Sequence, residues 1–320
     1  MHAVPLSLVA ILMLASLGAC AQAPPGLAQQ WQTFQSGPFR PIRPRTARYP
    51  LSDQSNRGDW VPYAPMTDEF NGTKLDGAKW FPTNPTWKGR QPAWFNPANV
   101  TVAGGCLNLT MRKQDAPEDL RREGYHTYSS AAVQSRGTVL YGYFEVRAKP
   151  MPSAGSSAFW FYKADPEEWT EIDVFEIGGR AKGFERKDHI TVHVFHTPQI
   201  KEHFQIGDAW IAPWDLDADF HVYGLEWDER ELKFYVDGVL VRRGPNTHWH
   251  QPLTMNFDSE TMPDWFGLPQ DADLPSTYRI DYVRAWKHRR DAQHASIAAS
   301  AEGGDHDALR TSSAPRPKIR

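Results

Sequence analysis

The chain has 320 residues, of which 40% are hydrophobic and 23% are charged, and its net charge is -3 at pH 7. These values are ordinary for a soluble globular protein. The weakly negative balance provides no basic surface field, which excludes nucleic acid as a partner. The length fits one large β domain or two small ones.

The chain begins like an exported bacterial protein. Residues 4–19 form an apolar run too short to span a membrane comfortably, and small residues follow it. A charged start is missing, since only His2 precedes the run. We expect a signal peptide over residues 1–23, ending at Ala23 or, at a lipoprotein-type box, before a lipid-bearing Cys20. Either exit predicts a secreted protein or a periplasmic or cell-surface lipoprotein with an outer-membrane anchor.

Composition divides the rest of the chain into three segments. Residues 24–62 are rich in Pro, Arg, Gln and Ser, which predicts a linker or a loose wrap on the domain. Residues 63–288 are expected to form the catalytic domain, and residues 289–320 a disordered tail. Cys106 has no partner in the mature chain, so disulfides do not hold the fold, and its setting favours a small buried hydrophobic residue.

The body of the chain predicts strands. Five short segments alternate or are rich in β-branched and aromatic residues: residues 99–103, 107–112, 142–148, 190–196 and 232–236. Long helical periodicity is absent. The pair Asp237 and Gly238 between two apolar runs is a strong hairpin signal. Regularly spaced strands with turns between them favour an all-β sandwich of two antiparallel sheets.

The most unusual segment of the chain is residues 171–176, where three acids alternate with apolar residues. Carboxylates are unfavourable inside a strand. Glu171 and Asp173 share one face of a regular strand, whereas Glu176 falls on the other face because its offset is odd. A β-bulge at residues 174–175 would bring all three acids to one face. A solvated strand face is the alternative, but it does not account for the odd offset.

Three acids on one face are typical of glycoside hydrolysis, which uses two carboxyl groups about 5–5.5 Å apart for retention or roughly 6.5–9.5 Å apart for inversion. Four effective steps of about 3.3 Å separate the outer backbones by about 13 Å, so only long side chains leaning inward reach the retaining distance. Both outer residues are Glu and the middle one is the shorter Asp. This favours a nucleophile, a helper and an acid/base.

Residues 169–176 resemble the active-site signature of glycoside hydrolase family 16, in the form with one extra residue before the second Glu. Further blocks resemble the family's strands in the same order: residues 141–149, 220–227, 234–238 and 280–286. The resemblance implies a jelly-roll sandwich of two curved antiparallel sheets with an open concave cleft. It also implies that Glu171 is the nucleophile, Asp173 the assisting acid and Glu176 the acid/base of a retaining enzyme.

The resemblance extends to substrate-binding residues. It implies that Trp160 is the floor of the subsite at the cleavage point, with core packing as the alternative. It implies that His193 faces the cleft, with a purely structural histidine as the alternative. The 13 Trp agree with a sugar-binding surface, because an indole stacks well on the apolar face of a sugar, although part of them belong to the core.

The signals for the substrate are mixed. Trp87 and Arg90 lie in a segment similar to a cleft loop of β-agarases and porphyranases, where the planar guanidinium could pair with a hydroxyl or a sulfate. An incidental surface turn is the alternative. Glu260 matches an acid of the agarases' negative subsites, whereas residues 249–256 look closer to κ-carrageenases. Residues 115–130 and 262–276 are expected to form cleft-rim loops, which set specificity.

The resemblance implies no catalytic cofactor, but it implies a structural calcium on the convex side. Asp281, Glu69 and Gly105 would supply the oxygen ligands that calcium takes. No His/Cys cluster suggests zinc.

We therefore expect an exported, monomeric endo-hydrolase that binds a polysaccharide, with agarose, porphyran or a carrageenan as the substrate. Two alternatives are a β-1,3-glucanase (laminarinase), against which residues 87–90 argue, and a non-catalytic carbohydrate-binding protein on the same scaffold.

Overall fold

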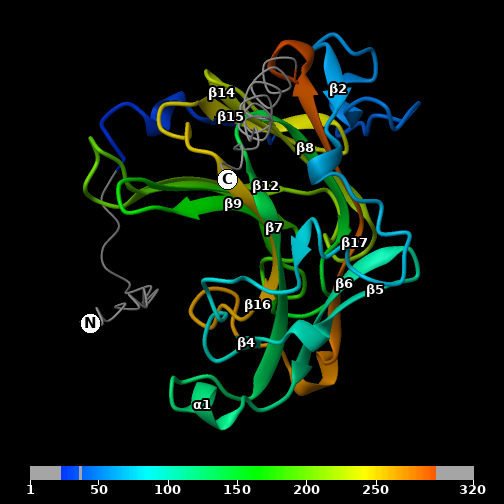
Figure 1. Cartoon of the computed structure of the whole chain (residues 1–320), viewed down its shortest axis with the longest axis vertical. Helices are drawn as coiled ribbons and strands as arrows, with labels where there is room; N and C mark the ends of the chain where they lie inside the picture. The colour runs from blue at the N-terminus through cyan, green and yellow to red at the C-terminus, as the bar shows by residue number, and fades with distance from the viewer. Residues whose placement is uncertain (1–22, 36–37, 293–320) are drawn as a thin grey trace, which may run out of the picture.

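The computed structural model describes residues 23–35 and 38–292 (Figure 1). The expected signal peptide up to residue 22, with Cys20, and the expected tail from residue 293 lie outside the described residues. In the described ranges no helix has the length and apolarity to cross a membrane. Cys106 is a buried free thiol.

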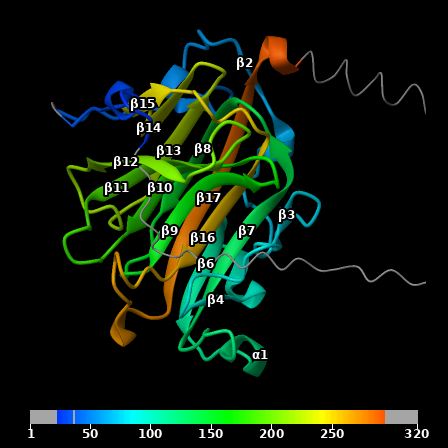
Figure 2. The ribbon, with the colours of Figure 1, turned by 90° about the vertical axis from the view of Figure 1, so that its left-hand side faces the viewer.

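The first sheet carries the acidic segment, and we call it the acidic sheet. Its strands lie in the order β3 (Trp80–Phe81), β7 (Tyr128–Val139), β16 (Leu253–Glu260), β9 (Ser156–Ala164), β10 (Trp169–Gly178), β11 (Lys187–His196) and β12 (Phe204–Ile211). All of these neighbours are antiparallel. Figure 2 shows β7, β16 and β9 side by side.

The second sheet packs behind the first, and we call it the supporting sheet. Its strands lie in the order β1 (Gln32–Thr33), β15 (Val239–Pro245), β14 (Glu231–Val236), β13 (His221–Trp227), β8 (Gly142–Lys149) and β17 (Ser276–His288). The other edge of β17 pairs with β6 (Cys106–Lys113), which continues to β5 (Val100–Ala103), and with β2 (Trp60–Pro62).

The remaining elements are short. β6 reaches across to β7, and the two-residue β4 (Trp94–Phe95) pairs with β7 in parallel, a departure from the otherwise antiparallel pairing of the described strands. The labelled helices are α1 (Glu118–Arg121), η1 (Ala28–Gln30), η2 (Leu51–Asp53), η3 (Ala64–Met66), η4 (Pro97–Asn99) and η5 (Asp271–Asp273), and residues 289–292 are also helical. The predicted class, an all-β sandwich of two curved sheets, is confirmed (Figures 1 and 2).

The core lies between the sheets because alternate side chains of each strand point there. Phe159 of β9 stacks on Phe257 of β16, with ring centroids 5.1 Å apart. Phe161 of β9 meets Phe144 of β8 across the interface at 5.1 Å. All four rings are fully buried, and each contributes about 1.5–3 kcal/mol by leaving water. This layer holds the acidic sheet in a fixed position.

The segment before the expected catalytic domain lies against the sheets. β1 extends the supporting sheet beside β15, and Trp31 is buried against Trp249, with ring centroids 6.0 Å apart. Further along, the N–H of Leu51 donates to the buried carboxyl of Glu145. The described part of residues 24–62 therefore contributes two strands, β1 and β2, and core side chains.

One buried acid has no evident structural use. Asp188 of β11 is 1% exposed, and neither carboxylate oxygen has a hydrogen-bond partner within residues 23–35 and 38–292. Burial raises the pKa of Asp188 well above its usual value. The folded protein therefore keeps a proton that the unfolded chain releases, and stability falls as the pH rises above the unfolded pKa of about 3.9.

Asp188→Asn should therefore stabilise the protein at neutral pH, because each unit by which folding raises the pKa costs about 1.4 kcal/mol. Urea-unfolding midpoints of variant and wild type should nearly coincide near about pH 4 and diverge towards about pH 8. The exposed Asp119→Asn is the control and should show no such divergence. A gap that stays constant with pH would contradict this assignment.

Candidate active site

A bulge in β10 brings the three acids to one face. Against β9, Asp173 pairs with Trp160 and Phe175 pairs with the next residue, Phe159, so Val174 is the extra residue. Val174 and Phe175 are both buried. Two consecutive core-facing residues change the alternation, which returns Glu176 to the face of Glu171 and Asp173. The predicted bulge is confirmed.

His193 of β11 lies opposite Glu171 on the same face. Its Nε2 is 3.2 Å from Asp173 Oδ2 and 3.9 Å from Glu171 Oε1. Its Nδ1 is 3.1 Å from His203 Nε2. The structure thus brings the expected His193 into contact with the acids.

The charges of this group determine where its protons lie. Burial, followed by the neighbouring charge of Asp173, raises the pKa of Glu171 to about 8. Burial, then Asp173 and Glu260, raises the pKa of Glu176 well above its usual value. Burial alone would lower the pKa of His193, but its contact with Asp173 outweighs burial and the pKa is raised.

The two outer acids differ in their charged neighbours. His193 and Arg90 both lower the pKa of Glu171, whereas among the main contributions to Glu176 only Arg90 lowers it and Glu171 itself raises it. Glu171 therefore ionises more readily than Glu176, and above the Glu171 pKa of about 8 the face holds a carboxylate beside a protonated carboxyl group. This is the division that a nucleophile and a general acid require.

The pKa of His203 indicates which histidine donates in the hydrogen bond between His193 and His203. Burial and the charge of His193 lower the pKa of His203 to about 4, so His203 is neutral near neutral pH. A protonated His193 then donates from Nδ1 to His203 and faces Asp173 with Nε2. The imidazolium thereby lies beside the carboxyl groups of Asp173 and Glu171.

Trp87, Arg90 and Glu260 meet at the edge of the acidic group. Arg90 Nε donates to Glu260 Oε2 at 2.8 Å, and its guanidinium carbon lies 5.8 Å from the centre of the Trp87 ring. The turn before Arg90 requires Gly89 at φ +113°, where a side chain would lie 2.9 Å from the Ala93 carbonyl. About 40% of the Arg90 side chain is exposed, which leaves part of the guanidinium open to a ligand.

Trp160 lies on the same face but is held tightly. Its Nε1 donates to Asp258, and its ring stacks on Tyr162 with centroids 4.7 Å apart. Trp87 contacts it edge-on at 6.2 Å. Since the side chain is only 8% exposed, Trp160 can present little more than an edge to a ligand.

The sequence did not indicate two of the supporting contacts. Asp258, which orients Trp160, lies two residues before the expected Glu260 and is 2% exposed. Trp249 Nε1 donates to the carbonyl oxygens of Glu171 at 2.9 Å and His193 at 3.0 Å. The indole thus connects β10 and β11 below the acids. Only its occurrence in residues 249–256, similar to κ-carrageenases, pointed to this segment.

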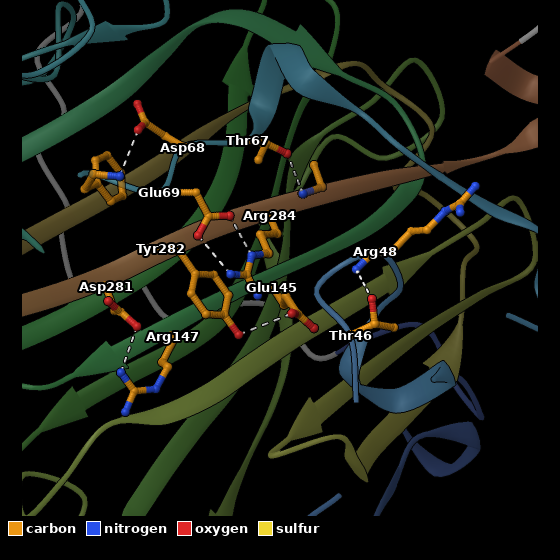
Figure 3. Close-up of polar contacts among 12 residues, drawn as sticks. Thr46, Arg48, Thr67, Asp68, Glu69, Glu145, Arg147, Asp281, Tyr282 and Arg284 are labelled. Atoms are coloured by element: carbon orange, nitrogen blue, oxygen red, sulfur yellow. Dashed lines mark hydrogen bonds and ion pairs between the residues drawn. The ribbon is translucent and has the colours of Figure 1, made fainter. Parts of the chain in front are cut away.

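Both acids expected at the calcium site are paired with arginines. Both carboxylate oxygens of Glu69 accept from Arg284, at 2.7 and 2.8 Å, and Asp281 accepts from Arg147 at 2.8 Å (Figure 3). Each carboxylate is already neutralised by an arginine. Gly105 lies in the turn between β5 and β6 and has no contact with either acid among the contacts of the described residues. The carboxylates of Glu69 and Asp281 are therefore engaged in ion pairs, and calcium at this place stays a prediction of the sequence.

A different set of donors could hold a metal ion. Ligand atoms of Glu171, Asp173 and His193 lie within 4.8 Å of one another. This set consists of the acidic group described above, whose charges already have an arrangement suited to proton transfer.

Comparison with known proteins decides the family. The model for the family 16 domain of β-porphyranases A–D matches residues 60–288. The chain belongs to glycoside hydrolase family 16. It is 30% identical over 251 residues to β-porphyranase E of Zobellia galactanivorans, and the matched region covers 71% of this chain and 88% of that protein. It is 27% identical over 265 residues to a κ-carrageenase of Pseudoalteromonas carrageenovora, covering 71% and 64% of the two chains.

The solved structures agree. The crystal structure of a β-porphyranase from the human gut bacterium Bacteroides plebeius superposes with a TM-score of 0.64 at 27% identity, covering 74% of this chain and 97% of that one. The family 16 jelly-roll fold is thereby confirmed, and the chain is a glycoside hydrolase of a retaining family that needs no catalytic cofactor. Membership in the family sets aside the non-catalytic alternative.

Trp249→Phe should slow catalysis without preventing folding, because it leaves the carbonyls of Glu171 and His193 unpartnered beneath the acids. An unsatisfied buried group costs about 1–3 kcal/mol, so we expect kcat to fall about tenfold with KM little changed. Trp214→Phe is the matched control, because Trp214 Nε1 has no partner in the described structure. Equal kcat values in the two variants, with equal melting temperatures, would contradict the positioning role of Trp249.

Proposed function

We propose that this family 16 enzyme is an exported endo-hydrolase that cleaves β-linkages in a red-algal galactan, with porphyran as the first candidate. The observation that carries the proposal is the position of Arg90. It is oriented by Glu260 and Trp87 and lies close enough to the acids to lower the pKa of both Glu171 and Glu176. Several β-porphyranases are among the relatives of this chain.

The proposed mechanism uses the two outer acids in sequence. The Glu171 carboxylate attacks the anomeric carbon while Glu176 protonates the glycosidic oxygen, so the bond to the leaving sugar breaks and a glycosyl–enzyme ester forms. Glu176, now ionised, removes a proton from water, and the water oxygen displaces Glu171 from the anomeric carbon. Two displacements retain the anomeric configuration and return both acids to their starting states.

Asp173, the middle acid, would change the pKa values of the two outer acids. Asp173 is 4% exposed, and it raises the pKa of both Glu171 and Glu176. Its contact with His193 places a counter-charge beside Glu171. Asp173 would keep Glu176 protonated, and His193 would make Glu171 easier to ionise.

Arg90 would recognise the substrate. A planar guanidinium pairs with two oxygens of a sulfate or with neighbouring hydroxyls, and a sulfated sugar would gain more from it than a neutral one. The alternative substrate is a β-1,3-glucan, since a glucan endo-1,3-β-glucosidase of Niallia circulans is 28% identical over 297 residues, which cover 42% of that protein. A neutral glucan offers Arg90 hydroxyl groups only.

The substrate test compares porphyran, agarose, κ-carrageenan, furcellaran and laminarin by the release of reducing ends. We expect the wild type to be most active on a red-algal galactan. Arg90→Met should lower kcat/KM about tenfold or more on a sulfated substrate. This loss corresponds to one charge-assisted hydrogen bond of roughly 1.5–3 kcal/mol.

Two controls accompany that comparison. Glu171→Gln should lose turnover on every polysaccharide, which shows that the activity belongs to this protein and not to a contaminant. Lys88 lies two residues before Arg90, and its Nζ pairs with Glu123. Lys88→Met removes this second cation and should leave the substrate preference unchanged. Highest activity on laminarin, with no effect of Arg90→Met, would contradict the galactan proposal. Export, and lipid attachment at Cys20, stay predictions of the sequence.

A further inference from the structure

The loop that follows β16 forms a tight turn at the edge of the acidic sheet. The N–H groups of Trp265, Phe266 and Gly267 all point to the Met262 carbonyl, at 3.0, 2.9 and 3.2 Å. Met262 and Phe266 are buried against Ala181, beyond the end of β10. This part of the expected rim loop is therefore packed onto the sheet.

Trp265 is the exposed side chain of this turn. It is 39% exposed, although large hydrophobic side chains are usually covered. Its ring stacks on Phe266 with centroids 4.4 Å apart and meets His189 edge-on at 4.7 Å. An indole held from two sides has already lost its rotamer freedom, so a ligand that covers it would lose little further entropy.

His189 connects this indole to the acids. It is the partner of Glu176 across β10 and β11, and its side chain therefore lies on the same face. Its Nδ1 is 3.3 Å from the Glu176 carbonyl oxygen. Burial lowers the pKa of His189 to about 4, so the imidazole is neutral near neutral pH and places no charge beside the indole. Trp265 is thus one side chain away from Glu176.

The neighbouring strand carries small residues on this flank. On β12 the residues opposite His189 and Thr191 are Ala209 and Gly207, and Gly207 is exposed. Arg90 and Glu260 lie on the opposite flank, since Glu260 belongs to β16 on the far side of β9. The acidic face therefore has a cationic flank at Arg90 towards β16 and an apolar flank around His189 and Trp265, beside the start of β11.

We propose that Trp265, supported by Phe266 and His189, is a binding platform for the apolar face of a pyranose ring on the leaving-group side of the cleavage point. The inference rests on the proposed function, because the acid that protonates the leaving oxygen is Glu176 and Trp265 lies beside Glu176. An aromatic ring and the C–H face of a sugar stack without regard to sulfate. This flank would therefore accept a neutral or a modified galactose unit, whereas Arg90 on the other flank would favour a sulfated one.

The test separates the two flanks by substrate. A galactan chain cleaved by the wild type places sugars on both sides of the acids, whereas the β-glycosyl fluoride of the released oligosaccharide places none on the leaving-group side. We expect Trp265→Ala to lower kcat/KM on the chain about tenfold, mainly by raising KM. A loss of this size corresponds to one aromatic contact together with the area that it buries. On the fluoride it should match the wild type, and Trp265→Phe should restore most activity on the chain.

The controls make every outcome decisive. Phe34→Ala removes another exposed aromatic ring, 40% exposed and next to β1 of the supporting sheet, and should change neither substrate. Equal losses on chain and fluoride in Trp265→Ala, or no loss on the chain, would overturn the platform. A wild type that cleaves only laminarin would refute the galactan proposal instead, and the same comparison with laminarin and its glucosyl fluoride would still decide the role of Trp265.

Discussion

The extra residue in β10 is the constraint on which the site depends. Without Val174 as an unpaired residue between Asp173 and Phe175, the sequence between Glu171 and Glu176 would put Glu176 into the core. The bulge is kept in place because Val174 and Phe175 both lie in the hydrophobic layer between the sheets. The packing of the core and the position of the acids are therefore one structural requirement.

The charges around the acids follow from that position. Five carboxyl groups gather where Arg90 and His193 bring the positive charge among the described residues. Burial and mutual repulsion therefore raise the pKa values of Glu171, Glu176, Asp258 and Glu260. Because His193 faces Glu171 and not Glu176, the two outer acids separate in their tendency to ionise. The same face can then supply a nucleophile and a proton.

Much of this arrangement could be predicted from the sequence. The odd offset of Glu176 indicated the bulge, and the alternating segments indicated the sandwich. Local patterns did not reveal contacts between distant segments: Trp249 reaches Glu171 over 78 positions, and the segment containing Trp31 contributes a strand. The ion pairs of Glu69 and Asp281 could not be predicted for the same reason, since their arginines lie 215 and 134 positions away.

We propose that substrate choice depends on the flanks of the site and not on its centre. The acids are framed by a cationic edge at Arg90 and an apolar edge at Trp265, and both are formed by loops that the strand pattern does not determine. Such loops can change while the sheet and the bulge stay the same.

The central claim is that the bulged strand presents Glu171 as the nucleophile. It is tested most directly by a substrate analogue with fluorine beside the anomeric carbon and an activated leaving group, which traps the glycosyl–enzyme ester for mass spectrometry of the peptides. The account predicts a sugar adduct on Glu171. An adduct on Asp173 or Glu176, or a product of inverted configuration without any adduct, would contradict it.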